Sequence, residues 1–260
     1  YRGSVENNYV KFAGFYWRVV RINGNGSIRI IYDGTSAHSN SESSTDRQYG
    51  TSQFNTAYNN NMYVGYMYTS GEAHGTGTSS TIKTNVDKFY TDKLSSYASK
   101  LDTNAGFCGD RSNLNLQSGV GIGTVITYNK GYLRVEESTP TLTCENVSDY
   151  YTVASASSGN KKLSYPIGLI TADEVMLAGH AGGVFDGTPN HQKSNNGSYL
   201  VTGNHFWTMT PAGGYNPFGV AGWDANVFNV YSSGHIDDHG TFNTYGLRPV
   251  VNLKSGVTIT

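Results

Sequence analysis

Three β-rich runs near the end of the chain constrain its fold more than any other feature. Residues 206–210 alternate apolar and polar side chains up to Pro211, and residues 225–231 form a second run that ends at a Ser-Ser-Gly turn. Residues 246–253 form a largely apolar last run. Such runs, separated by segments rich in Gly, Asn and Asp, are typical of strands joined by loops. The end of the chain therefore predicts a sheet with long, polar connections.

The start of the chain predicts a three-stranded meander. Residues 9–12, 15–22 and 27–32 are short β-rich runs, and the Asn-Gly-Asn-Gly sequence at 23–26 is a strong hairpin signal. The middle run carries apolar side chains on both of its faces, so we expect at least part of it to be buried on both sides. Its Trp17 is therefore expected to pack in the core rather than to stack on a ligand.

Two segments carry helical signals. Apolar residues recur at intervals of three to five between positions 81 and 101, which predicts one helix there. Thr171 and Glu174 have the spacing of a capping box, which predicts a second helix that Gly179 ends. By contrast, residues 124–133 are expected to form a β-like segment.

The remaining chain is polar but weakly charged. Only 14% of the residues are charged, whereas there are 20 Tyr and 32 Gly. We interpret residues of about 35–80 and 104–160 as irregular polar insertions in a single domain that spans residues 1–260. The net charge is -1 and no cluster of Lys and Arg occurs, which argues against a nucleic-acid partner.

A single pair of cysteines, Cys108 and Cys144, stands in the second insertion. A disulfide is the favoured interpretation, and two free buried thiols are the alternative. No apolar run is long enough to span a membrane. The chain begins at Tyr1 without Met, which fits a processed product. We therefore expect an extracellular protein that reaches a membrane only through an anchor outside these residues.

The C-terminal runs also resemble a known family. The order of Trp207, the Val-Phe-Asn-Val sequence at 227–230, Gly234 and the Gly-Leu-Arg-Pro-Val sequence at 246–250 resembles the end of C-type-lectin-like domains. Such domains occur in bacterial surface proteins and in retroelement-diversified variable proteins, and the formylglycine-generating-enzyme fold is more distantly similar. The resemblance implies an α+β, C-type-lectin-like fold with antiparallel sheets, two helices and long irregular loops. It also implies that the opening meander pairs with the strand at 250–253.

Candidate ligand-binding residues gather between Pro211 and Gly246. Tyr offers a large contact area at a small cost in side-chain entropy, while Asn, Asp and His offer adaptable hydrogen bonds. The alternation of the strand predicts that Asn229 and Tyr231 point outward. The candidates are Tyr215, Asn216, Phe218, Trp223, Asp224, Asn226, Asn229, Tyr231, His235, Asp237, Asp238, His239, Asn243 and Tyr245. The resemblance to retroelement-diversified proteins implies that this face can be a diversified one.

Residues 235–239 contain two imidazoles and two carboxylates, the most metal-like pattern in the chain. Because Gly234 and Gly240 bracket it, we expect a turn rather than a helix face, and no zinc site. Calcium is a weaker alternative, since the Glu-Pro-Asn motif of calcium-dependent lectins is absent. Its oxygen ligands would be Asp224, Asn226, Asp237 and Asp238.

No catalytic constellation emerges from the sequence. A Gly-x-Ser-x-Gly elbow is not found where a nucleophile would need it, and no cysteine lies in the C-terminal part beyond Cys144. The sequence therefore predicts no enzyme and no cofactor. It predicts a recognition or adhesion module at the bacterial cell surface that binds a protein or glycan on another cell or a host. The alternative is a pilin-like or filament subunit that self-assembles.

Overall fold

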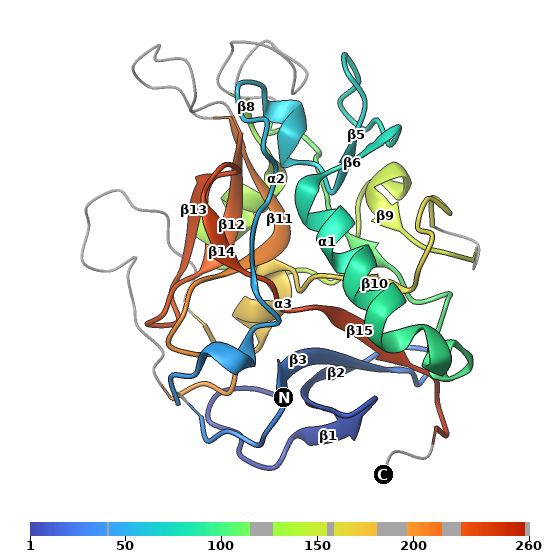
Figure 1. Cartoon of the computed structure of the whole chain (residues 1–260). Coiled ribbons are helices and arrows are strands. Elements are labelled where there is room, and N and C mark those ends of the chain that lie inside the picture. Colours follow the sequence, from blue (N-terminus) through green and yellow to red (C-terminus); the bar gives the residue numbers. More distant parts are fainter. Residues whose placement is uncertain (41, 115–126, 155–158, 181–196, 215–224, 258–260) are drawn as a thin grey trace.

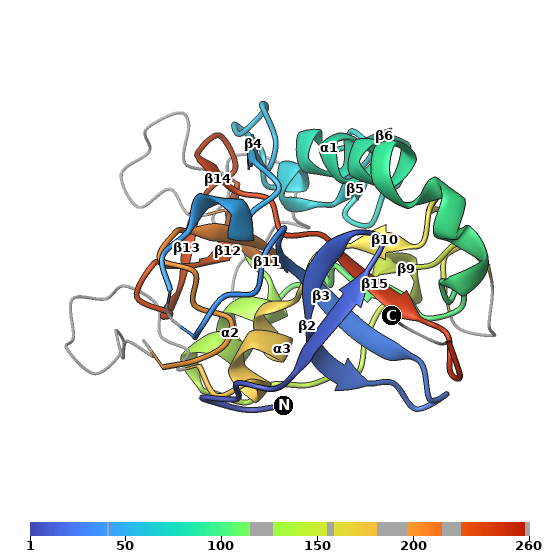
Figure 2. The ribbon, with the colours of Figure 1, turned by 60° about the horizontal axis from the view of Figure 1, so that its bottom comes forward.

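The first and last strands share one antiparallel sheet, which confirms the predicted pairing. The computed structural model describes residues 1–40, 42–114, 127–154, 159–180, 197–214 and 225–257. The sheet has the order β1-β2-β3-β15-β10 (Figures 1 and 2). Its strands are β1 (Tyr9–Phe12), β2 (Phe15–Ile22), β3 (Ile28–Gly34), β15 (Val250–Leu253) and β10 (Ile167–Gly168). Val250 of β15 lies opposite Ile31 of β3.

The hairpin between β2 and β3 forms as its turn residues predict. The Asn23 amide donates to the Ser27 carbonyl, and Gly26 adopts a positive φ of 80° that suits glycine. Trp17 of β2 is fully buried, and its indole N–H donates to the Phe12 carbonyl. The predicted core role of Trp17 is therefore confirmed.

The second sheet has the order β13-β12-β11-β14-β4, and β8 also pairs with β11. Its strands are β11 (Phe206–Gly214), β12 (Asn226–Val230), β13 (Ile236–Gly240), β14 (Thr244–Gly246), β4 (Thr51–Gln53) and β8 (Thr127–Tyr128). β11 continues past the expected end at Pro211, with irregular register on both sides of that residue. Such irregularity is where a strand tolerates proline.

Residues 235–239 are not the expected turn. The turn lies just before them, because the Tyr231 amide donates to the His235 carbonyl and Gly234 has a positive φ of 88°. The chain then pairs with β12 as β13. The run at 246–253 is also divided, since β14 and β15 belong to different sheets. The prediction of one last strand is therefore wrong, because the chain passes from one sheet to the other around Pro249.

The described residues contain three α-helices where two were predicted. α1 (Thr81–Phe89) continues as a π-helical turn at Tyr90–Leu94 and a 3-10 helix at Ser95–Lys100, so the predicted extent is right but the helix is not uniform. α3 (Ala172–Leu177) begins with the predicted capping box. α1 contacts β4 of the second sheet and β10 of the first (Figure 2).

The β-like prediction for residues 124–133 is wrong for its end, because α2 (Lys130–Glu136) begins there. α2 packs on α3 and on β11. Its Gly131 permits this approach, since a Cβ there would lie 2.6 Å from Thr210 Cγ2 and 2.8 Å from the Pro211 carbonyl oxygen. Packing against the sheet stabilises a helix here, although the local residues favour a helix only weakly.

The two insertions are part of the framework rather than mere decoration. Besides β4 and β8 they contribute two small pairs, β5 (Met67–Tyr68) with β6 (Thr78–Ser79) and β7 (Phe107–Cys108) with β9 (Tyr150–Tyr151). Buried side chains from both insertions, such as Phe54 and Phe107, join Trp17 and Trp207 in one hydrophobic cluster. The polar composition of these segments concealed the few apolar residues that anchor them in the core.

Cys108 and Cys144 form the predicted disulfide, with their Cα atoms 5.6 Å apart. It ties β7 to the segment that follows α2. None of the helices in the described ranges is long and apolar enough to cross a membrane.

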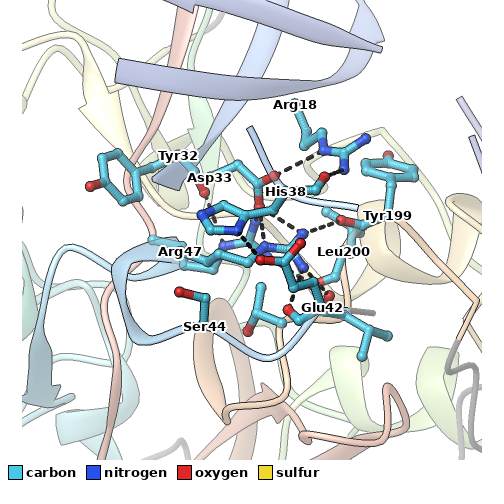
Figure 3. A network of polar contacts seen from close by, with 12 residues as sticks. Arg18, Tyr32, Asp33, His38, Glu42, Ser44, Arg47, Tyr199 and Leu200 are labelled. Atoms are coloured by element: carbon cyan, nitrogen blue, oxygen red, sulfur yellow. Dashed lines mark hydrogen bonds and ion pairs between the residues drawn. The ribbon is translucent and has the colours of Figure 1, made fainter. Parts of the chain in front are cut away.

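A buried ionic network around Asp33 of β3 joins the opening meander to the first insertion and to the segment between β14 and β15 (Figure 3). Its carboxylate lies 2.9 Å from each of three guanidinium groups, those of Arg18, Arg47 and Arg248, and all four side chains are fully buried. Backbone carbonyls accept most of the remaining arginine protons, as when Arg47 Nη1 donates to Val201. Burial and the neighbouring guanidiniums lower the pKa of Arg248 to about 9. Three cations therefore share one carboxylate, which makes Asp33 the central residue of this network.

Candidate functional site

The structure brings together every candidate ligand-binding residue that it describes. Asn226, Asn229, Tyr231, His235, Asp237, Asp238, His239, Asn243 and Tyr245 all lie on β12, β13 and β14 or in the turns between these strands. The other candidates, Tyr215, Asn216, Phe218, Trp223 and Asp224, lie outside the described residues.

The centre of the site is a set of five rings, here called the imidazole–tyrosine cluster: His205, Tyr231, His235, His239 and Tyr245. The ring centroid of Tyr231 lies 4.1 Å from that of His205, 4.0 Å from that of His235 and 5.5 Å from that of His239. Tyr245 completes the cluster, 5.2 Å from His205 and 5.5 Å from His239. Four of these rings are half-buried, whereas His235 is buried.

Sequence reasoning missed His205 because the relevant strand pairing is parallel. β11 pairs with β14 through Phe206 and Gly246, and the Gly246 amide donates to the His205 carbonyl. This pairing places His205 beside Tyr245. Its position directly before an alternating run was the only available signal.

Asn229 lies beneath the cluster and is fully buried, so the prediction that it points out to solvent is wrong. Strands on both sides and the rings above cover it. Its side-chain amide donates to the Asp237 carbonyl at 2.9 Å and to His239 Nδ1 at 3.0 Å. Because Nδ1 accepts, the proton of neutral His239 is assigned to Nε2, which lies 3.2 Å from the Tyr231 hydroxyl. Asn229 thus positions His239 rather than binding a ligand itself.

Burial keeps the cluster uncharged near neutral pH. It lowers the pKa values of His205, His235 and His239, with a further contribution from the neighbouring imidazoles for His205 and His235. Burial, together with Asp237, raises the pKa of Tyr231. Neutral imidazoles and phenols offer both donors and acceptors at ring edges, which suits recognition of hydroxyl and amide groups.

The described residues include no group of three or more His, Cys, Asp or Glu side chains placed to hold a metal ion. On a strand the two histidines at 235 and 239 are separated by roughly 13 Å along the chain, and the Tyr231 ring contacts both. Of the calcium candidates, Asn226 donates to the Asp238 carboxylate at 2.8 Å. Burial and Asp237 raise the pKa of Asp238 to about 6.

An exposed aromatic pair adjoins the strands that carry the cluster. Phe242, in the turn between β13 and β14, lies 5.0 Å from Tyr58 between ring centroids. The two side chains are 38% and 40% exposed, so this pair presents apolar area to solvent. The Thr241 hydroxyl donates to the Ala57 carbonyl and holds the two segments together. Tyr58 belonged to the tyrosine-rich first insertion, whereas nothing in the sequence singled out Phe242.

We expect the fold to lose stability as the pH falls from about 6.5 to 4. His180 is buried, with Nδ1 2.5 Å from the Gly234 carbonyl oxygen, and burial lowers its pKa to about 4. The His180 side chain therefore binds a proton near pH 6.5 in the unfolded chain but only near pH 4 in the folded chain. The stability that this difference provides is present above pH 6.5 and is lost as the pH falls to 4. The loss from His180 alone is roughly 3 kcal/mol. Urea unfolding at several pH values measures it.

Two variants separate the contributions to this pH profile. His180→Asn keeps a donor for the Gly234 carbonyl and should flatten the loss. Asp238 acts with the opposite sign, because its raised pKa favours the protonated folded state and opposes stability as the pH rises toward 6. Asp238→Asn should therefore steepen the loss on acidification. A profile that His180→Asn leaves unchanged contradicts the assignment.

The chain matches no protein-family model, no curated protein and no solved structure. Its resemblance to C-type-lectin-like domains therefore stays a hypothesis, and the function has to be inferred from the geometry of the site.

Proposed function

We propose that this chain is an extracellular recognition or adhesion module of a bacterial cell surface, built on a C-type-lectin-like frame. It binds a protein or glycan partner through the imidazole–tyrosine cluster and the adjoining pair of Tyr58 and Phe242. The observation that carries the proposal is the contact of five aromatic and imidazole rings on neighbouring strands of the second sheet and at the ends of these strands.

The chemistry of the cluster favours binding of a polar surface with apolar patches. Ring faces can stack on a sugar ring or an apolar side chain, and the ring nitrogens and phenol groups can bond to hydroxyl and amide groups. β-Strands hold these rings in place, so little side-chain entropy is lost when a partner binds. The disulfide between Cys108 and Cys144 supports an extracellular location.

The pairing of the opening meander with β15 supports the C-type-lectin-like frame in this proposal. The resemblance implies that arrangement, together with ligand-binding residues between Pro211 and Gly246. Four of the five cluster residues lie in that segment, and His205 precedes it.

The test is the double variant Tyr231→Ala and Tyr245→Ala. Adherence of coated beads to bacterial cells, epithelial cells and immobilised glycans should fall by roughly tenfold or more, since central aromatic residues dominate binding energy. The matched control is Tyr63→Ala with Tyr68→Ala, because these half-buried tyrosines also contact each other, at 5.0 Å between ring centroids, on a different part of the fold. Circular dichroism confirms folding of both variants.

Self-assembly is measured in the same samples by light scattering and electron microscopy. Loss of adherence with assembly intact supports the adhesin. Loss of assembly alone favours the filament subunit, in which the cluster would pack against a second copy. Adherence and assembly that both survive the double variant contradict the proposal.

A further inference from the structure

A cavity of about 450 Å³ lies apart from the imidazole–tyrosine cluster, none of whose residues lines it. Its walls come from the first sheet, from α2, from the start of α3 and from the loop that the disulfide holds. This volume falls in the range of small-molecule binding sites. The charged side chains that line it are Arg21, Arg29, Arg134, Asp110, Asp173 and Glu174.

The charges are divided unevenly between two sides of the cavity. On one side Arg134 is held by two carboxylates: its Nε lies 2.7 Å from Asp173 and its Nη1 lies 3.1 Å from Asp110. The carboxylate oxygens of Asp173 and Asp110 also accept backbone N–H groups from Thr141 and Ser112. These acceptors are occupied, so this side offers little to a cationic ligand.

On the other side two arginines share one carboxylate. Arg21 Nε and Arg29 Nε lie 2.8 Å and 2.9 Å from the same oxygen of Glu174. The second oxygen of Glu174 accepts the Thr171 amide in the capping box. One negative charge therefore faces two positive charges.

The donors of these two arginines are not all used. Arg29 is 1% exposed, and its Nε makes no hydrogen bond, because its N–H does not point at the Glu174 oxygen despite the short distance. Arg29 Nη1 donates to the Gly106 carbonyl. Arg21 makes no other hydrogen bond within the described residues than the one to Glu174, and its side chain is 28% exposed. Its two terminal nitrogens are therefore available to a ligand.

We infer that this cavity binds the carboxylate of a small polar molecule at Arg21 and Arg29. Three arginines and three carboxylates line the cavity as a whole, but the Arg21–Arg29 side has a local excess of one positive charge. This local excess suits a monoanion better than a dianion such as phosphate, and the planar fork of a guanidinium matches a carboxylate. Amide and hydroxyl side chains complete the wall, with Asn104 and Thr143 among them. Acidic sugars and amino acids both combine a carboxylate with further polar groups. The inference does not rest on the proposed function of the cluster.

Isothermal titration with soluble probes tests the inference on the intact, oxidised chain. At least one of glucuronate and glutamate should bind saturably. The probe that binds more tightly shows whether the carboxylate belongs to an acidic sugar or to an amino acid. Glucose lacks the charge and should not bind. Binding of neither acid, equal binding of glucose, or tighter binding of inorganic phosphate overturns the inference.

Two variants change the local charge in opposite directions. Arg21→Gln should weaken binding of the preferred acid by roughly tenfold, and Arg2→Gln, at an exposed arginine outside the cavity, is the matched control. Glu174→Gln keeps a residue that can cap α3 but removes the competing carboxylate, so it should strengthen binding. An affinity that Arg21→Gln leaves unchanged contradicts the site even if Glu174→Gln fails to fold.

Discussion

Replacing Asp33 by asparagine is expected to destabilise the fold by about 3–5 kcal/mol, because a buried ionic network that loses one partner keeps uncompensated charge. The carboxylate of Asp33 is the one that Arg18, Arg47 and Arg248 share, each at 2.9 Å and without solvent contact. Asparagine has nearly the same shape but supplies no charge and turns a donor toward a donor. Urea unfolding followed by circular dichroism measures the change.

Asp92→Asn is the control for this prediction. Asp92 also pairs with a cation, Lys88 at 2.8 Å, but both side chains are solvent-exposed. Exposed ion pairs contribute little to stability, so the control should unfold at nearly the same urea concentration as the unaltered chain. If Asp33→Asn behaves like Asp92→Asn, the backbone carbonyls rather than the carboxylate hold the three guanidiniums.

The second large effect concerns the disulfide. A double replacement of Cys108 and Cys144 by serine should lower the free energy of unfolding by roughly 3 to 4 kcal/mol, since the bond closes a loop of 36 residues in the unfolded chain. A reducing agent should produce the same shift in the unaltered chain and none in the double variant. An unaltered chain that resists denaturant equally well in both redox states would contradict this estimate.

Local patterns predicted the elements that depend on neighbouring residues. The Asn-Gly-Asn-Gly turn formed its hairpin, and the capping box of Thr171 and Glu174 began its helix. The burial of Trp17 followed from apolar residues on both faces of its strand. The pairing of the meander with β15 came from the family resemblance, because no local signal indicates which distant strands will pair.

Elements set by distant contacts were missed. α2 forms where the sequence favours a strand, because Gly131 lets it pack closely on β11. Arg47 lies in a stretch of polar residues that resembled an irregular loop, yet it is fully buried against Asp33. Its role depends on Arg18 and Arg248, which are remote in sequence.

The candidate site was predicted only in part, because distant strand pairings also shape it. The strands that carry Tyr231, His239 and Tyr245 lie together, so the segment was chosen well as a structural unit. Simple alternation failed at Asn229, because the strands on both sides of it and the rings above it bury its side chain. His205 entered the site through a parallel pairing that no turn signal announces.

The most direct test of the proposed recognition role is photo-crosslinking from the surface of the site. Asn243 lies in the turn between β13 and β14 and donates to the Gly240 carbonyl, so a photoreactive residue placed there adjoins the cluster. A second variant of the chain carries the photoreactive residue in place of Glu72, in the turn between β5 and β6. The account predicts crosslinks to a glycan or protein of the adhering surface from position 243 and none from position 72. Equal crosslinking from both positions, or crosslinking from position 72 alone, would contradict it.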